Sequence, residues 1–351
     1  MIKSSYNVLG IMSGTSLDGV DIAHIKFTFN EKWQYTFLEC ETIPYPHFWF
    51  LKLKNLVGLS KDNLEIIDQD YTAYLASVIN TFVTKHQIAS LDFISSHGHT
   101  ALHEPEKGFT LQIGNKQILA HLTQQTVVCD FRVQDVQLGG QGAPLVPIGD
   151  KLLFSDFDYC LNLGGFANIS TEDNGNRIAY DICPANIVLN HYVASLGLDF
   201  DDSGKIAASG QVNLALLKNL NSLEFYKKSH PKSLGLEWVD KFIFPRINAF
   251  EIPIKDILRT FVAHIAIQIG HQIKNGKTLI TGGGAYNSFL IEEIKTQTKA
   301  ELVIPNSKLV NYKEALIFSL LGVLKQRNEV NCLASVTGAK MDHSSGRTFQ
   351  P

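Results

Sequence analysis

One local pattern occurs twice along the chain: a short apolar strand, a glycine-rich turn and a returning strand. It spans residues 7–29, where the turn reads SGTSLDG, and recurs at 159–170 around Gly164 and Gly165. Strands joined by so few residues pair antiparallel. In both halves the following segments alternate between strand and helix patterns, which is typical of α/β folds. The sequence therefore predicts an α/β protein with two related lobes.

The length of the chain suits two domains of ordinary size. With 351 residues, 45% of them hydrophobic, each half can bury its own core. Apolar residues at three- and four-residue spacing predict helices at 64–82, 256–273 and 312–326. We place the N-terminal lobe at 1–137 plus 335–351 and the C-terminal lobe at 138–334. The stretch LGGQGAPLVP, at 138–147, is the expected crossing, and two facing lobes predict a ligand-binding cleft.

The first glycine-rich turn offers groups suited to phosphate. Glycines leave backbone N–H groups open to a ligand, and the hydroxyls of Ser13, Thr15 and Ser16 add donors. Asp18 and Asp21 are candidate Mg²⁺ ligands. An ordinary hairpin loop is the alternative, because Gly, Ser and Asp all favour turns. The nucleotide-binding residues predicted here are Gly14, Thr15, Ser16, Leu17, Asp18, Gly19, Val20 and Asp21.

Two later glycine turns extend the predicted nucleotide site. Gly164 and Gly165 form a second glycine turn between two strands, in the second lobe, although a β-bulge or close strand packing would explain them as well. Gly282, Gly283 and Gly284 lie between a strand and a helix, where a flat adenine or ribose could approach the backbone. A simple flexible turn is the alternative at that position.

Several charged residues are candidates for catalysis or substrate binding. Asp181 ends a strand in YDICPAN and is a candidate general base, although many such aspartates only form turns. Cys183 beside it fits a buried residue better than a nucleophile. Arg132 follows a strand and could bind a carboxylate or phosphate, or form a surface ion pair. Glu314 stands in a first helical turn, where the helix dipole alone favours it.

Three histidines, His97, His99 and His103, lie close together in SSHGHTALH. Their spacing raises the possibility of a zinc site, but no HExxH or other ligand pattern accompanies them. We favour polar lining of the cleft, with His97 as a substrate contact.

Composition bears on partners and compartment. The net charge is −3 and no basic stripe is present, so we expect no nucleic-acid partner. No apolar run reaches membrane-spanning length and the N-terminus lacks a signal-peptide pattern, which predicts no membrane association and a cytoplasmic location. The five cysteines are scattered without a CxxC pair, which fits reduced thiols.

Taken together, these segments resemble the anhydro-N-acetylmuramic acid kinase family over nearly the whole chain. The matching motifs, in chain order, are GIMSGTSLDGVD, SHGHT, FTLQIG, DFRVQD, GGQGAPLVP, LNLGGFANIS, YDICPAN, ASG, PKSLG, TGGGAYN, KEAL and SVTGA. The resemblance implies two RNase H-like lobes of the actin/hexokinase/Hsp70 type around a nucleotide cleft. It also implies a reaction: ATP, water and 1,6-anhydro-N-acetylmuramic acid become ADP and N-acetylmuramic acid 6-phosphate.

The resemblance assigns roles to particular residues. It places the catalytic base at Asp181 and a second catalytic carboxylate, near the sugar and water, at Glu314. The arginine of the DFR motif is Arg132, and we expect it to bind substrate together with His97 and Asn186. ATP and Mg²⁺ are the implied cofactors, and related enzymes pair as homodimers. A kinase of another sugar or acid, and a nucleotide-binding protein without catalysis, remain alternatives.

The chain departs from the family pattern at a few places. DICPAN stands where the family reads DTGPGN, so Ile182, Cys183 and Ala185 replace a threonine and two glycines. The family's HGQT is HGHT, LGLEW follows PKS in place of a GREL-like run, and NY precedes KEAL in place of a small acidic pair. The DICPAN change predicts a stiffer loop and an altered sugar pocket.

Overall fold

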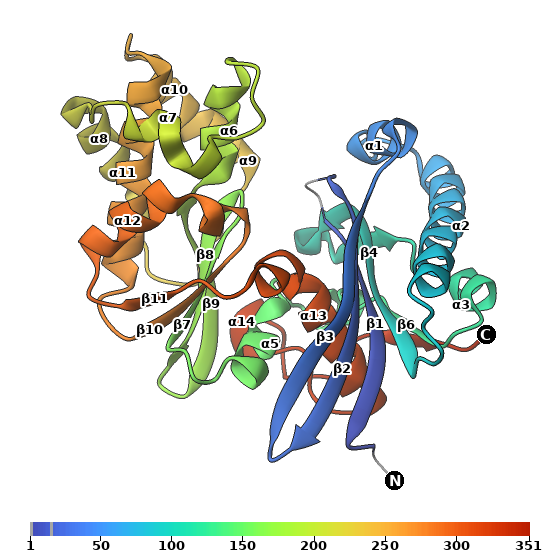
Figure 1. Ribbon diagram of the computed structural model, residues 1–351. Coiled ribbons are helices and arrows are strands. Elements are labelled where there is room, and N and C mark those ends of the chain that lie inside the picture. The colour runs from blue at the N-terminus through green and yellow to red at the C-terminus, as the bar shows by residue number, and fades with distance from the viewer. Residues whose placement is uncertain (1–2, 15–16) are drawn as a thin grey trace. The chain divides into compact units, whose positions relative to one another are not determined.

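The computed structural model describes residues 3–14 and 17–351, which form two compact units (Figure 1). The first unit contains the chain up to Leu153 together with Tyr312–Pro351, and the second contains Phe154–Asn311. These boundaries differ from the predicted ones at 137/138 and 334/335. The physical reason is that the glycine-rich stretch 138–147 is held within the first unit. Gly142 N–H donates to the Asp135 carboxylate, and Gln141 N–H to the Thr337 carbonyl.

The sheet of the first unit is built on an antiparallel meander. β1 pairs with β2 and β2 with β3, whereas β4 and β6 add in parallel on the other side of β1. β12 then pairs antiparallel with β6, and β5 with the far end of β4. The strands are β1 Ser5–Ser13, β2 Gly19–Asn30, β3 Lys32–Pro44, β4 Phe93–Glu104, β5 Phe109–Ile113, β6 Val127–Cys129 and β12 Arg347–Phe349.

The sheet of the second unit has the same order. β7, β8 and β9 form an antiparallel meander, and β10 and β11 add in parallel beside β7. In both units the strand order thus begins third, second, first, fourth, and the next parallel strand is β6 in the first unit and β11 in the second, which is RNase H-like. This confirms the prediction of two related α/β lobes. The strands are β7 Tyr159–Leu163, β8 Phe166–Asp173, β9 Asn176–Pro184, β10 Lys277–Thr281 and β11 Glu301–Val303.

Helix α2 supports the sheet of the first unit. The apolar spacing predicted a helix at 64–82, and the observed helix runs from Lys61 to Lys85 after Ser60, whose hydroxyl caps the Asn63 N–H. Its buried face packs with β1 and β2 in one apolar core. The other helices of this unit are α1 His47–Lys54, α3 Gln117–Thr123, α4 Val133–Gln137, α5 Val146–Leu153 and α14 Ala334–Thr337.

Helix α11 has the same role in the second unit. It runs from Ile254 to Gln272, close to the predicted 256–273, and buries one apolar face in the core of that unit. The remaining helices of this unit are α6 Asn186–Ala194, α7 Lys205–Ala208, α8 Leu214–Asn221, α9 Leu236–Phe242, α10 Phe244–Asn248 and α12 Ser288–Gln297. The side chain of Asn287 accepts from the Leu290 N–H and caps the start of α12.

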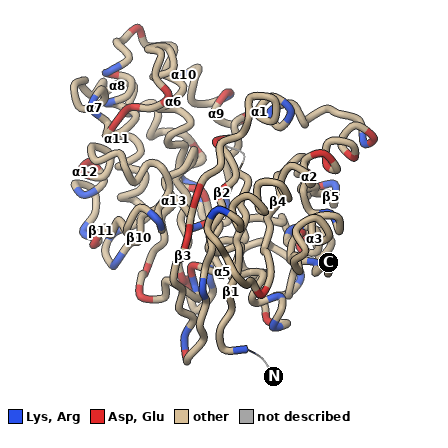
Figure 2. The backbone as a smooth tube through the Cα atoms, turned by 45° about the vertical axis from the view of Figure 1, so that its right-hand side comes forward, with Lys and Arg blue, Asp and Glu red and all other residues tan. Residues whose placement is uncertain are grey.

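Helix α13 carries the chain from the second unit into the first. It begins at Ser307, five residues before the predicted start, and ends at Gln326. The backbone leaves helical geometry at Tyr312 (φ −114°, ψ 17°), which is where the first unit resumes. Among the residues that the structure describes, no helix is long and apolar enough to cross a membrane. Lys and Arg are interspersed with Asp and Glu along both units (Figure 2).

Candidate active site

The first glycine-rich turn connects β1 to β2. The strands stay paired as far as Ser13 and Val20, and Leu17 then takes the left-handed backbone conformation (φ 62°) while its N–H donates to the Gly14 carbonyl at 3.4 Å. Thr15 and Ser16 lie outside the described residues. Gly19 has a packing role: a Cβ there would lie 2.3 Å from the Ile43 carbonyl oxygen, so only glycine lets β3 pass this close.

Ser13 anchors the start of this turn. Its side chain is buried, and its hydroxyl contacts the Tyr45 hydroxyl at 2.5 Å, the Tyr71 hydroxyl at 2.8 Å and His99 Nδ1 at 2.9 Å. We expected this hydroxyl to serve as a phosphate donor. The structure shows instead that it is used inside the protein, where three aromatic side chains hold the end of β1. His99 thus belongs to this anchor, and burial lowers its pKa to about 4.

Asp21, at the end of this turn, is a partly buried carboxylate with other carboxylates nearby. Burial raises its pKa to about 6, and the charges of Glu314 and Asp18 act in the same direction. The Thr42 hydroxyl donates to its Oδ1 at 2.6 Å and favours the ionised form. The donor set fits Mg²⁺, which takes oxygen ligands, and a divalent cation would relieve the repulsion among these carboxylates. Asp18 is exposed and can complete such a site.

Arg132 is held in a fixed orientation by a chain of hydrogen bonds. Its Nε–H donates to His97 Nε2 at 3.0 Å, and its Nη1 donates to the Gly142 carbonyl at 2.7 Å. The guanidinium also lies over the Phe318 ring, 5.7 Å from its centroid. Burial lowers the pKa of Arg132 to about 10, so the group stays cationic at neutral pH. No described residue accepts a hydrogen bond from Nη2, which leaves this nitrogen for an anionic ligand.

His97 orients Arg132 by accepting a hydrogen bond from it. It is buried on β4, and its Nδ1 lies 2.7 Å from the Gly98 carbonyl. Because a carbonyl only accepts, Nδ1 carries the proton and Nε2 is free to accept from Arg132. Burial and the neighbouring Arg132 charge hold the pKa of His97 well below its usual value, which keeps the ring neutral. We expected His97 to line the cleft; in the structure it orients the arginine.

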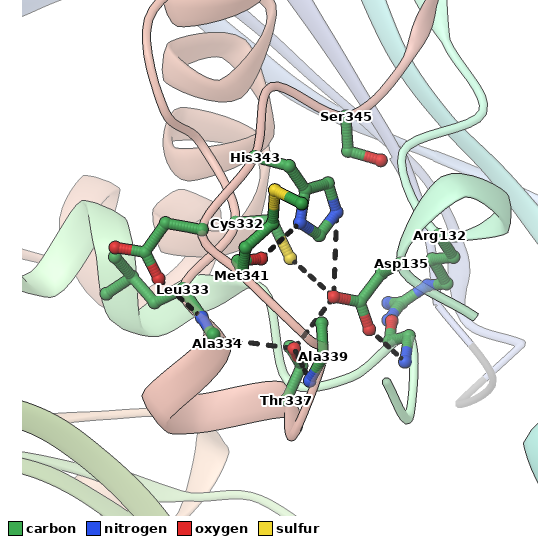
Figure 3. Close-up of polar contacts among 12 residues, drawn as sticks. Arg132, Asp135, Cys332, Leu333, Ala334, Thr337, Ala339, Met341, His343 and Ser345 are labelled. Carbon is green, nitrogen blue, oxygen red and sulfur yellow. Dashed lines mark hydrogen bonds and ion pairs between the residues drawn. The ribbon is translucent and has the colours of Figure 1, made fainter. Parts of the chain in front are cut away.

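Asp135 holds the glycine-rich loop that carries Gly142. It is fully buried at the start of α4, and its Oδ2 accepts from the Gly142 N–H at 2.6 Å (Figure 3). Its Oδ1 accepts from the Thr337 hydroxyl at 2.7 Å and from the Cys332 thiol at 3.0 Å. A Cβ on Gly140 would lie 2.2 Å from this carboxylate, which explains the glycine. DFRVQD, GGQGAP and SVTGA thus meet at one carboxylate.

Glu314 lies just after the kink in α13. The side chain keeps contact with solvent, while the surrounding protein raises its pKa and the charges of Arg132 and Lys313 lower it. The neighbouring Lys313 points the other way and forms a buried ion pair with Asp150 of α5 at 2.7 Å. Glu314 therefore shares an electrostatic environment with Arg132 and Asp21 within the first unit.

The second glycine turn, between β7 and β8, is not required by packing. Gly165 is exposed, and a Cβ there would meet nothing closer than 3.7 Å. The carbonyls of Gly164 and Gly165 accept from the N–H groups of Asn186 and Ala185 at the start of α6. The Asn186 side chain donates to the Leu163 carbonyl at 3.1 Å. The close-packing alternative therefore does not explain Gly165, whose backbone is open to a ligand.

The three glycines after β10 divide into two kinds. Gly282 has φ +82° and a Cβ there would lie 2.5 Å from Asn162 Oδ1, and a Cβ on Gly284 would lie 2.7 Å from Leu163 Cβ. These two are needed because the turn packs tightly on β7. Gly283 is exposed, and a Cβ would reach only Asn186 Nδ2, at 4.0 Å. Gly283 is the one of the three whose backbone a ligand can approach.

Asp181 lies half-buried near the end of β9. Its Oδ2 accepts from the Leu234 N–H at 2.7 Å, and its own N–H donates to the Lys232 carbonyl at 3.1 Å. Burial raises its pKa to about 6, and the Leu234 hydrogen bond partly opposes this shift. A carboxylate with a pKa near the working pH suits a general base. The PKSLG segment therefore fixes one oxygen and leaves the other for chemistry.

The departures in DICPAN point into the core. Ile182, Cys183 and Ala185 are buried within the apolar cluster of the second unit. The pairing of β8 with β9 shifts register beside Asp181, so that Asn168 faces Asp181 and Ala167 faces Cys183. Such a bulge re-aims a side chain. The expected alteration of the sugar pocket by these three residues is therefore not supported, and burial raises the pKa of Cys183, as expected of an inert thiol.

Sequence patterns do not reveal the residues that hold the site residues in place. Asp135 was visible within DFRVQD, and Lys232 and Leu234 within PKSLG, but no pattern connects them to Arg132 or Asp181. Thr42, which donates to Asp21, lies in β3 and carries no motif at all. Only the folded register brings these partners together.

Two RNase H-like units, each opening on a strand, a glycine turn and a returning strand, are the architecture that the resemblance to a kinase family implied. The chain belongs to the anhydro-N-acetylmuramic acid kinase family, whose model matches residues 6–351.

Named relatives match along almost their whole length. The anhydro-N-acetylmuramic acid kinase of Mannheimia succiniciproducens is 34% identical over 379 residues, with 99% of this chain and 100% of the relative covered. That of Pseudomonas syringae pv. syringae is 34% identical over 355 residues (95% and 96%), and that of Bacillus cereus 30% identical over 379 residues (98% and 99%).

Proposed function

We propose that this chain is an ATP-dependent kinase that opens 1,6-anhydro-N-acetylmuramic acid with water and phosphorylates O6, giving N-acetylmuramic acid 6-phosphate. Full-length membership of the family supports the substrate and the reaction. The single observation that carries the chemistry is Asp181, a half-buried carboxylate with a pKa of about 6 and one oxygen fixed by the Leu234 N–H.

The reaction needs one base. The anhydro bridge joins C1 to O6, so water must attack C1 while O6 departs, and an alkoxide is a poor leaving group. If O6 takes the γ-phosphoryl group as the C1–O6 bond breaks, no free alkoxide forms. A single carboxylate, Asp181, then accepts the proton of the attacking water, whereas ordinary glycosidases use a carboxylate pair. Glu314 is the proposed second carboxylate, near the sugar and the water.

The phosphates are bound by backbone and charge. Phosphoryl transfer depends mainly on positioning and on neutralisation of the phosphate charge. We assign the β1–β2 turn, Gly14 to Asp21, to the phosphates of ATP, and the open backbones of Gly165 and Gly283 to the same nucleotide. Mg²⁺, held by Asp21 and Asp18, would neutralise phosphate charge when bound. Arg132 offers Nη2 to the sugar carboxylate or a phosphate, because His97 and Gly142 already occupy Nε and Nη1.

The remaining proposals rest on the resemblance. Asn186, beside both glycine turns of the second unit, is the proposed contact to the sugar there. The resemblance also implies a homodimer, and the scattered cysteines, which fit reduced thiols, favour a cytoplasmic location.

An ADP-release assay tests the proposal. We expect ADP only when ATP, Mg²⁺ and 1,6-anhydro-N-acetylmuramic acid are all present, with a product whose mass equals the sugar plus water plus one phosphoryl group. A panel of hexoses and amino sugars is the control for sugar identity. Strong turnover on a simple hexose and none on the anhydro sugar would reject the substrate. ATP binding without turnover on any muramic derivative would reject catalysis altogether.

A further inference from the structure

A buried group of potential metal ligands lies in the first unit, around Asp135. Asp135, Cys332 and His343 each present one ligand atom, and these atoms lie within 4.8 Å of one another (Figure 3). All three side chains are buried. They come from the start of α4 and from the segments on either side of α14, so the fold, not local sequence, brings them together.

The orientation of His343 is the first observation that points to a cation site. Its Nδ1 lies 3.0 Å from the Met341 carbonyl, which can only accept, so Nδ1 carries the proton. In the neutral ring Nε2 is then an acceptor. This atom is buried, has no hydrogen-bond partner among the described residues, and lies 3.6 Å from Asp135 Oδ1. Two buried acceptor atoms then face each other, which is unfavourable unless a cation or a proton lies between them.

The same geometry is the usual one of a metal-bound histidine. Such a histidine donates its other ring N–H to a carbonyl or carboxylate, which fixes the tautomer and aims the lone pair at the metal. Met341 supplies that carbonyl here. The carboxylate is also fixed from outside, because Asp135 accepts from the Gly142 N–H and the Thr337 hydroxyl.

The donor set selects the kind of ion. Cys332 Sγ lies 3.0 Å from Asp135 Oδ1, so the three ligands are one sulfur, one imidazole nitrogen and one carboxylate oxygen. Magnesium and calcium prefer oxygen alone, whereas zinc takes sulfur, nitrogen and oxygen in tetrahedral sites.

We propose that Asp135, Cys332 and His343 bind one zinc-type divalent ion. On binding, the S–H bond of Cys332 breaks, its proton passes to solvent, and the sulfur forms a bond to the metal. Asp135 keeps its bonds to Gly142 and Thr337, and a water molecule takes the fourth position. The ion would tie the segment 331–345 to the loop whose Gly142 carbonyl orients Arg132. Its role is therefore structural, and it does not depend on the proposed sugar.

Metal content of the purified full-length chain tests this site. The protein is produced without a histidine tag, kept reduced, incubated with Zn²⁺ and dialysed before elemental analysis. We expect one zinc per wild-type chain. Cys332→Ser and His343→Gln each lose a ligand, and we expect their zinc affinity to fall by more than the roughly 10–100-fold that loss of an outer partner causes. Cys40→Ser, which removes the half-buried thiol of β3, is the matched control and should keep wild-type affinity.

Cobalt substitution gives a second readout that needs no variant. Co²⁺ in the wild-type site should show the absorption of a thiolate bound to cobalt, and far-UV circular dichroism should show that the variants are folded. A wild type that binds no zinc, or a cobalt form without thiolate absorption, overturns the proposal. So does zinc binding that survives both ligand substitutions.

Discussion

At the scale of single residues, two opposing influences set the behaviour of Asp181. Burial disfavours its charge, while the Leu234 N–H favours it, and the net effect raises the pKa to about 6. The carboxylate is therefore ionised at neutral pH but still basic enough to take a proton. Asp21 has a similarly raised pKa, yet the same-sign charges of Glu314 and Asp18 contribute to it, which suits a cation site better than a base.

We predict that kcat/KM falls as the pH drops below about 6, because the base must be ionised and protonation of Asp181 removes it. Asp181→Asn should lower kcat by about 10²–10⁴-fold, the usual contribution of a general base, and remove this acid limb. The pH–rate profile in the ADP assay measures both. Asp173→Asn, at the exposed end of the neighbouring strand, is the control. Normal turnover of Asp181→Asn would show that the base is elsewhere.

We predict that Asp21→Asn stabilises the apo protein at pH 8 while it weakens Mg²⁺-dependent turnover. The folded-state pKa lies above the unfolded value, so the contribution of Asp21 to stability is present at low pH and is lost as the pH rises through about 6. The neutral amide still accepts from Thr42 and avoids this loss. The free energy of unfolding of the variant should exceed that of the wild type by roughly 1 kcal/mol at pH 8. This figure allows for the screening of the half-buried side chain by solvent, and the difference should shrink toward pH 4. Thermal melts at both pH values without Mg²⁺ measure it, and a melting temperature unchanged at pH 8 would contradict the assignment.

At the scale of elements, turns and a helix junction decide which residues reach the site. α13 starts at Ser307 but leaves helical geometry at Tyr312, so that Lys313 enters the core of the first unit and Glu314 stays in contact with solvent. The glycine turns also contain two kinds of residue. Some glycines are needed because a Cβ would clash with a neighbouring strand, and others leave their backbone accessible to a ligand. Sequence alone shows the glycines but does not separate the two kinds.

We predict that Lys313→Met destabilises the protein by about 3–5 kcal/mol, because it removes the buried cation that pairs with the Asp150 carboxylate. Replacing both residues, in Lys313→Met with Asp150→Leu, should recover much of this loss. Denaturant unfolding measures the change. Lys151→Met, at the exposed neighbour of Asp150 on α5, should change stability by less than about 0.5 kcal/mol. If Lys313→Met alone is as stable as Lys151→Met, the ion pair does not hold α13 on α5.

We predict opposite outcomes for two glycine variants in the second unit. Gly282→Ala should lower the melting temperature markedly, because φ is +82° and the Cβ would lie 2.9 Å from the Leu163 carbonyl carbon. Gly165→Ala has room and should fold normally, but its methyl group should raise the KM for ATP if a phosphate approaches this backbone. Melting curves and ATP titrations separate the two effects. An unchanged KM in Gly165→Ala would remove this turn from the nucleotide site.

At the scale of the whole molecule, the repeated strand order explains why a chain of this length is two units. Each meander uses short turns, and each pair of added parallel strands needs a crossover, which the intervening helices supply. The crossover between the meander and β4 contains α1 and α2, and that between β9 and β10 contains α6 through α11. Each sheet thereby gains an apolar core of its own.

Much of this was predictable from the sequence. Periodicity and short turns identified both meanders and the long helices, because these depend on local residue patterns. The glycine turns, Asp181 and Arg132 stood out for the same reason. The unit boundaries could not be predicted in this way, because a glycine-rich stretch resembles a linker. Only the hydrogen bonds to Asp135 and Thr337 place 138–147 inside the first unit.

Local sequence patterns are thus sufficient for the α/β class, for the repeat of its two lobes and for the residue types available for phosphate and base chemistry. The partners of the site residues depend on the folded structure: His97 for Arg132, Leu234 for Asp181, Thr42 for Asp21, and Cys332 and His343 for Asp135. The physical reason is that hydrogen-bond partners and burial depend on which strands and loops pack together. These contacts join residues far apart along the chain, and no local pattern encodes them.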